Sequence, residues 1–196
     1  MRAALSGVLL LVSVVARAEL PGWRGVDHFG IAVPDIEVAT AFLVDIIGCE
    51  HIISAGPFGG ADGPMADWLE GQLGVDRRAS IKQLRMLRCR VGSNIELFEW
   101  DAPDEVQRYP KLSDYGGNHI AFYVDDLAAA VDYLKSKGVQ IIGGPLAIEQ
   151  GDMAGDPIIY VKTPWGGYIE LVSYPGGMGY EQDTDRRLWH PARPGE

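Results

Sequence analysis

The sequence has few cysteines, few basic residues and no long apolar run. Only 2 of its 196 residues are Cys, and they form no Cys-x-x-Cys motif, which argues against a disulfide-dense scaffold or a cysteine zinc site. The 17 Lys and Arg against 27 Asp and Glu give a formal net charge of −10. Such a surface repels phosphate backbones, so nucleic acid is an unfavourable partner. No run reaches the ~20 apolar residues of a membrane span, so none is expected in the mature chain.

The first 18 residues have the order of a secretory signal peptide. A basic start at Met1-Arg2 precedes an apolar stretch from Leu5 to Val15, and Ala16-Arg17-Ala18 is a small-x-small cleavage site. An N-terminal anchor helix and a misplaced start codon are the alternatives. Cleavage after Ala18 predicts an exported protein, periplasmic or secreted, that works in an oxidising compartment.

The remaining chain contains one pattern twice. VDHFGIAV resembles GNHIAFYV, and this alignment places His28 on His119, 91 positions further on. After each segment an acidic residue, Asp35 or Asp126, precedes apolar residues at helical spacing that end at a glycine. Strand-like runs follow in both copies. Because 47% of the residues are hydrophobic and 22% charged, both copies have material for a core.

Each copy closes on Ile-Glu-Leu, which holds Glu96 in the first and Glu170 in the second, only 74 positions further on. The first copy therefore has 17 extra residues. The expected class is α+β, with two tandem strand-helix-strand-strand-strand modules forming a curled, barrel-like mixed sheet with outer helices. The predicted parts are a signal peptide (1–18), a linker (19–25), a first module (26–100) with an insert (56–80), a linker (101–117), a second module (118–175) and a polar tail (176–196).

Alternation along the strands determines which side chains share a face. In the first strand Phe29, Ile31 and Val33 are expected to pack on the helix, so His28 points the other way; the same argument applies to His119. In the closing strands Ile and Leu face the helices and the glutamates face away. Two histidines and two glutamates are thus expected on the helix-free faces at equivalent positions: His28, Glu96, His119 and Glu170.

This donor set suits a divalent transition metal such as Zn, Ni, Co, Mn or Fe. The alternative is a row of solvent-facing polar residues on an antiparallel sheet. His51 and His190 have no counterpart in the other copy and are expected at the surface, and Glu99 falls on the helix face. Whether one chain or a homodimer completes the metal site stays open.

The phrases "DHFGIAVPDIEVATAFL", "NIELFEW", "GGNHIAFYVDDLAAAVDYL" and "PWGGYIELVSYP" resemble the vicinal oxygen chelate superfamily. This superfamily includes glyoxalase I, extradiol dioxygenases and bleomycin-binding proteins. The stretch "RMLRCRVGSNIELFEW" looks most similar to a branch with epimerases of cyclitol precursors. The resemblance implies one metal held by the four residues above and a small substrate chelated through adjacent oxygens.

The implied activity is isomerisation, epimerisation or lyase chemistry through an enediolate, with Glu170 as the leading catalytic base and Glu96 as its partner. Phe98, Tyr123 and Tyr168 share the ligand faces and are candidates for substrate binding. A metal-dependent thiol transferase or extradiol-type dioxygenase, and a non-catalytic small-molecule binding protein, are the alternatives.

The two cysteines also leave two states open. Cys49 opens the second strand and Cys89 lies late in the third. If these strands pair as a hairpin, the thiols come close enough for a disulfide, which an oxidising compartment permits. Two buried free thiols are the alternative.

Overall fold

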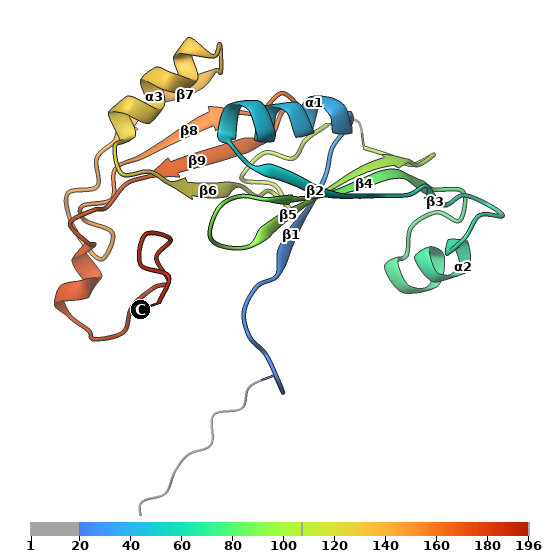
Figure 1. Ribbon diagram of the computed structural model, residues 1–196, viewed down its shortest axis with the longest axis horizontal. Helices are drawn as coiled ribbons and strands as arrows, with labels where there is room; N and C mark the ends of the chain where they lie inside the picture. Colours follow the sequence, from blue (N-terminus) through green and yellow to red (C-terminus); the bar gives the residue numbers. More distant parts are fainter. Residues whose placement is uncertain (1–19, 107, 196) are drawn as a thin grey trace, which may run out of the picture.

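The computed structural model describes residues 20–106 and 108–195. The predicted signal peptide over residues 1–18 lies outside this part of the chain. Two mixed sheets lie side by side (Figure 1). The first has the order β1 (His28–Ala32), β5 (Asn94–Asp101), β4 (Ser80–Arg88) and β2 (Glu50–Ala55), with β3 (Phe58–Gly59) also paired to β4. The second has the order β6 (Ile120–Tyr123), β9 (Tyr168–Val172), β8 (Ile158–Lys162) and β7 (Ile141–Leu146).

The two sheets repeat one topology. In each, the first strand lies parallel to the last, as β1 with β5 and β6 with β9, and the other pairings are antiparallel. The α+β class and the two strand-helix-strand-strand-strand units are therefore confirmed. The sheets curl but do not close into a barrel. The exact boundaries of modules, linkers and tail stay predictions.

The helices begin and end where the sequence predicts. The side chain of Asp35 accepts a hydrogen bond from Val38 N (3.0 Å) at the start of α1 (Ile36–Ala41), and Asp126 does the same for Ala129 N (2.9 Å) at α3 (Leu127–Ser136). Such caps satisfy amide groups that have no partner within the helix. The first helix continues as the π-helical segment η1 (Phe42–Ile47) and stops at Gly48, whose φ of 89° favours glycine.

One apolar core joins the two modules. Its buried members come from both sheets, from α1 and η1, and from α3. Across the module boundary the Phe42 ring meets Trp165 edge-on, with centroids 5.7 Å apart, and the Tyr133 hydroxyl donates to Ile46 O (3.0 Å). Phe29 shares the face of Ile31, as predicted, but is exposed because it lies near the start of β1, at the edge of the first sheet.

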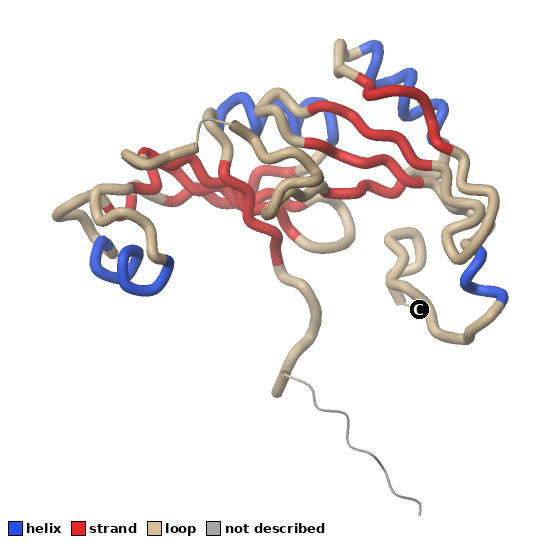
Figure 2. Tube along the Cα trace, turned by 180° about the vertical axis from the view of Figure 1, so that it is seen from behind, coloured by secondary structure: helices blue, strands red, loops and turns tan. Residues whose placement is uncertain are grey.

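Two segments lie on the side of the sheets opposite α1 and α3 (Figures 1 and 2). One is the insert of the first module, which folds into α2 (Ala66–Trp68) and η2 (Leu69–Leu73). The other is the C-terminal tail, which contains the 3-10 turn η3 (Gly179–Gln182). The insert and the tail therefore lie on the faces expected to carry the candidate ligands.

A disulfide links the strands β2 and β4 at one end of their hairpin. Cys49 precedes β2 and Cys89 follows β4, and their Cα atoms are 4.3 Å apart. Of the two states that the sequence left open, the structure has the bonded one.

Within the described residues, no helix has the length and apolar character needed to cross a membrane.

Candidate metal and substrate site

The first module pairs His28 with Glu96 on the helix-free face of its sheet. Backbone register places Gly30 beside Glu96, and the His28 ring reaches across so that Nε2 lies 3.3 Å from Glu96 Oε2. Nδ1 lies 2.7 Å from Asp27 Oδ1, and this hydrogen bond raises the pKa of His28, with the charge of Glu96 adding to the shift. In the neutral tautomer whose Nδ1–H donates to Asp27, His28 presents its Nε2 lone pair to the Glu96 carboxylate. Such a pair calls for a cation or a proton beside it.

The second module repeats this pair with His119 and Glu170. The Nε2–Oε2 distance is 2.9 Å, and Glu170 is buried. Tyr160 of β8 stands beside Glu170 in the register and meets the His119 ring edge-on at 5.4 Å. Burial raises the pKa of Tyr160, and the Glu170 carboxylate raises it further. The pair is thus more enclosed than its counterpart.

The structure brings the four predicted ligands together as two pairs. Among residues 20–106 and 108–195, no three His, Cys, Asp or Glu side chains are gathered into a set that could hold a metal ion. Each pair supplies two donors, whereas a transition-metal site usually takes three or four protein ligands. Within the described residues, one chain therefore does not gather the four predicted ligands into a single metal site.

Glu99 lies on the helix face of its strand, as predicted, and connects the sheet to the start of α1. Its carboxylate accepts hydrogen bonds from Ile36 N at the start of α1 (3.1 Å) and from Lys82 Nζ (2.8 Å). These donors lower the pKa of Glu99, with Lys82 as the larger cause. Glu99 therefore holds helix to sheet on the face away from His28.

The three predicted substrate-binding residues have different surroundings. Phe98 lies against Gly30, so close that a Cβ there would come 3.3 Å from its ring, and it lines an apolar pocket. Tyr168 has Lys162 Nζ 3.8 Å above its ring centroid. Tyr123 packs edge-on against Tyr174, at 5.1 Å.

His190 is buried, so the expectation of a surface position is wrong. It is only 7% exposed, and its ring lies 4.4 Å from Tyr123 and 4.9 Å from Tyr174. Its Nδ1 accepts from Ala192 N (3.1 Å), and Nε2 is buried without a hydrogen-bond partner. The tail sequence has no strand or helix periodicity, so nothing in it signalled that this ring lies against the second sheet.

Sequence reasoning also missed Asp156. This carboxyl is almost fully buried before β8 and accepts from Ser173 N (3.3 Å). Burial raises its pKa, and the nearby Glu170 charge raises it further. Asp156 and Glu170 thus lie close enough for their charges to interact. The sequence offered one weak signal, an acidic residue in a Gly-Asp-Pro turn that opens a strand.

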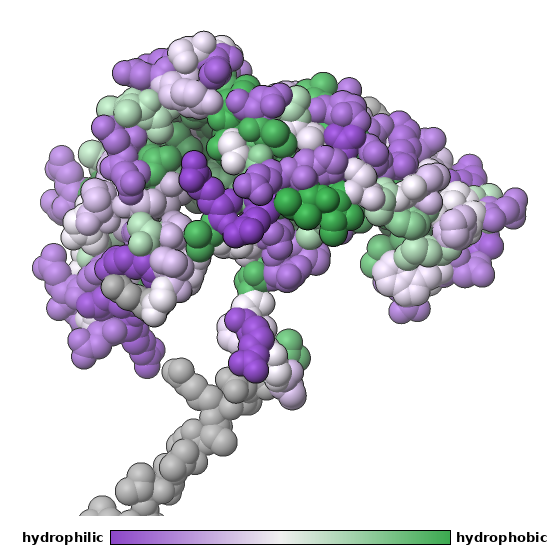
Figure 3. Space-filling model, in the orientation of Figure 1, coloured by the Kyte–Doolittle hydropathy of each residue, from purple (hydrophilic) through white to green (hydrophobic). Residues whose placement is uncertain are grey.

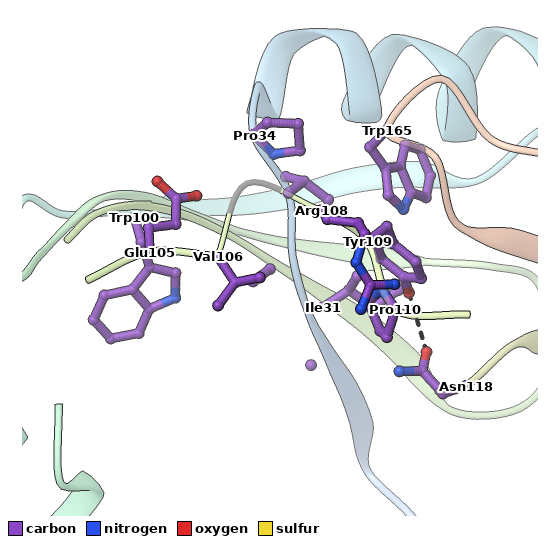
Figure 4. Close-up of a pocket in the computed structure, with 13 residues that line it drawn as sticks. Ile31, Pro34, Trp100, Glu105, Val106, Arg108, Tyr109, Pro110, Asn118 and Trp165 are labelled. Carbon is purple, nitrogen blue, oxygen red and sulfur yellow. Dashed lines mark hydrogen bonds between the residues drawn. The ribbon is translucent and has the colours of Figure 1, made fainter. Parts of the chain in front are cut away.

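A second cavity lies where the linker over residues 101–117 passes the edge of β1. It has a volume of about 430 Å³ and includes Trp100, Arg108 and Trp165 in its lining (Figure 4). The half-buried Tyr109 donates from its hydroxyl to Asn118 Oδ1 (3.1 Å), and partial burial raises the pKa of Tyr109. Since Gly30 and Ala32 also line it, this cavity borders the first module's ligand face.

Comparisons with known proteins agree with this architecture. Residues 27–160 match the family model described as Glyoxalase/Bleomycin resistance protein/Dioxygenase superfamily. A curated protein from Actinomyces sp, named 2-epi-5-epi-valiolone epimerase, is 38% identical over 173 residues, which cover 88% of this chain and 91% of that protein.

A solved structure of a glyoxalase family protein from Bacillus cereus gives the same fold. It is 19% identical, with a TM-score of 0.57, and the match covers 81% of this chain and 97% of that one. The doubled module, the paired His and Glu positions and these matches lead to one conclusion. The chain belongs to the glyoxalase/bleomycin resistance protein/dioxygenase superfamily, and its similarity to an epimerase supports isomerase or epimerase catalysis on a small molecule.

Proposed function

We propose that this protein is a divalent-metal-dependent epimerase or isomerase that removes a proton next to a carbonyl of a small substrate with adjacent oxygens. The observation that carries the proposal is the repeated pair, with His28 facing Glu96 at 3.3 Å and His119 facing Glu170 at 2.9 Å. A structural role does not require the same two residue types at both equivalent places. The epimerase name of the 38% identical relative supports the reaction class.

The donor atoms fit a metal in kind and in spacing. Two ligands at ~2.0–2.2 Å from one ion lie about 3.0–3.5 Å apart in octahedral or tetrahedral geometry, and both observed N–O distances are close to that range. Two imidazoles with two carboxylates suit Zn, Ni, Co, Mn or Fe. Because each pair has only two donors, we propose that a second pair, from the other module or from a second copy of the chain, completes the site.

A bound divalent ion would polarise a substrate oxygen and so make the neighbouring C–H more acidic. The protein's own part is to take and return the proton. Glu170 is the leading base because it is buried beside Tyr160 and carries its carboxylate into the ligand face. Glu96 is its equivalent in the first module and the candidate second base, as an epimerase requires when a proton leaves one side of a carbon and returns on the other.

Metal content and proton exchange test this proposal. The purified protein should hold one divalent ion per pair of modules, and His28→Ala and His119→Ala should each remove most of it. His51→Ala is the matched control, since His51 is exposed and bonds only Ser54 and Ile53 O locally. In D₂O, deuterium should enter the α-carbon of a 2-hydroxy ketone substrate during turnover. Equal metal content in all three variants would contradict the proposal.

Oxygen consumption or thiol-adduct formation in the same assay would instead favour a dioxygenase or a thiol transferase. Binding of a small molecule without any turnover would favour a non-catalytic binding protein. Each result replaces the proposed reaction while leaving the fold unchanged.

We also propose that the chain is exported after cleavage of residues 1–18. The Cys49–Cys89 disulfide supports this, because such bonds persist in oxidising compartments. The intact mass of protein expressed with its leader should correspond to a chain that begins at Glu19. A mass that includes Met1 or Arg2 would contradict it.

A further inference from the structure

An apolar pocket of about 510 Å³ lies between the first sheet and the insert. We call it the insert pocket. Its floor comes from the ligand face of β1, β4 and β5, and its wall comes from β3, α2 and η2. All of its lining residues are apolar: Gly30, Ala32, Phe58, Met65, Trp68, Leu69, Leu73, Ile81, Leu84, Phe98 and Trp100.

The insert that forms the wall is anchored to the sheet. Leu69 is buried, and its Cδ1 lies 2.7 Å from where a Cβ on Gly59 would stand, so the glycine permits the close packing. Within the insert, Arg77 pairs with the carboxylates of Asp67 and Glu70. A wall held in this way keeps a fixed shape, which suits a binding pocket.

The pocket side of the insert nevertheless leaves apolar surface open to solvent. Trp68 is 50% and Leu73 53% exposed, and Met65 is similarly open. Figure 3 shows apolar surface among polar areas on the face it displays. Exposing large apolar side chains around a concave site is unfavourable unless a ligand covers them.

The inner end of the pocket reaches the first His–Glu pair. A Cβ on Gly30 would lie 3.3 Å from the Phe98 ring and 3.8 Å from Glu96 Oε2. The carboxylate and the apolar floor are therefore separated only by the glycine backbone and the edge of one ring. A single small molecule can contact both.

We propose that the insert pocket binds an apolar portion of the substrate, an aryl or branched alkyl group, whose oxygen-bearing end lies at His28 and Glu96. This inference rests on the proposed function for the reacting end. The volume falls within the range of about 300–1,000 Å³ typical of small-molecule sites. Apolar side chains offer almost no partners for hydroxyl groups, and buried hydroxyls without partners are costly. A fully hydroxylated ring therefore does not suit this pocket.

Calorimetric binding of two matched compounds tests the inference. Hydroxyacetone and 2-hydroxy-1-phenylethanone share adjacent oxygens and differ in the phenyl group. The aryl compound should bind at least about tenfold more tightly. Trp68→Ala and Leu73→Ser should each reduce this ratio at least about threefold, whereas Leu146→Ser, which changes a comparably exposed side chain on β7, should leave it unchanged.

The outcomes separate this inference from the proposed reaction. A retained aryl preference in a protein without metal or proton exchange would support the pocket and remove the proposed function. Exchange on hydroxyacetone with equal binding of both compounds would do the reverse. If Trp68→Ala changes self-association in light scattering but not the ratio, the insert is a contact between copies and the pocket assignment is wrong.

Discussion

The two modules place the same His–Glu pair at equivalent positions of the repeated fold but surround it differently. The repeat offsets align Ala32, Met86 and Trp100 of the first module with Tyr123, Tyr160 and Tyr174 of the second, respectively. In the first module an insert leaves an open apolar pocket beside the pair. In the second, the tail seats His190 on two tyrosines. The repeated backbone thus positions the reactive groups, while the inserted and terminal segments set their environment.

The core faces of the modules differ in the same way. Arg85 of β4 is buried and contacts Glu37 and the Thr40 hydroxyl of α1. Its equivalent, 74 positions on, is Ile159, which is buried among apolar residues. At this position the first module therefore has a charged contact between helix and sheet, whereas the second has an apolar side chain in the core.

The largest expected difference is in catalysis. Glu170→Gln keeps the shape of the side chain but removes its ability to accept a proton, so kcat should fall by about 10²–10⁴-fold. Glu96→Gln should have a smaller effect, since the more enclosed pair is assigned the leading base. Both variants are compared at equal metal content.

Equal losses would show that both carboxylates act as bases, as in an epimerase with one base on each face. Full activity of Glu170→Gln with metal bound would remove the assigned role. Solvent deuterium incorporation, measured in parallel, separates loss of proton transfer from loss of binding.

The sequence was sufficient for the parts of this molecule that repeat. Offsets of 91 and 74 residues aligned the histidines and glutamates, and strand alternation placed them on one face. Asp35 and Asp126 marked the helix starts because capping depends on local sequence.

The surroundings of the site were not predictable in this way. His190 is buried by rings 67 and 16 positions away in Tyr123 and Tyr174, and no periodic pattern connects them. Asp156 is likewise buried by tertiary packing rather than by its own neighbours. Whether the two pairs meet depends on how modules or copies associate, which strand patterns do not encode.

The next prediction exchanges the core residues of the two modules. Ile159→Arg should destabilise the protein by about 3–5 kcal/mol, because a buried charge would have no partner. Arg85→Ile should cost less than about 1 kcal/mol or be stabilising, because Glu37 is exposed and Thr40 keeps its bond to Ile36 O. Urea unfolding measures both. A large loss in Arg85→Ile would mean that the charged contact itself stabilises the first module.

The disulfide should stabilise the first module by about as much free energy as Ile159→Arg is expected to cost. It closes a loop with a sequence separation of 40, for which loop entropy predicts about 4 kcal/mol. The equivalent places in the second module hold Gln140 and Thr163. The double variant Cys49→Ala with Cys89→Ala should therefore lower the free energy of global unfolding. Amides of β8 and β9 that exchange through local opening should keep their protection. If amides in both sheets lose protection against local opening equally, the disulfide does not act on the first module alone.

The smallest expected effect is a pH-dependent one at Glu99. Lys82 and the amide of Ile36 lower its pKa in the folded protein from the ordinary value of 4.5. Ionised Glu99 therefore stabilises the fold fully above the unfolded pKa, and this contribution is lost as the pH falls through the folded pKa.

The equivalent residue in the second module is Ser173, which does not titrate. Glu99→Gln should cost up to about 2 kcal/mol at neutral pH. That difference should shrink between about pH 5 and pH 3. Other acids such as Glu37 titrate in both proteins and cancel. For the control Ser173→Ala, the difference in unfolding free energy from the wild type should not vary with pH. If the difference for Glu99→Gln is also constant, the charge of Glu99 does not stabilise the start of α1.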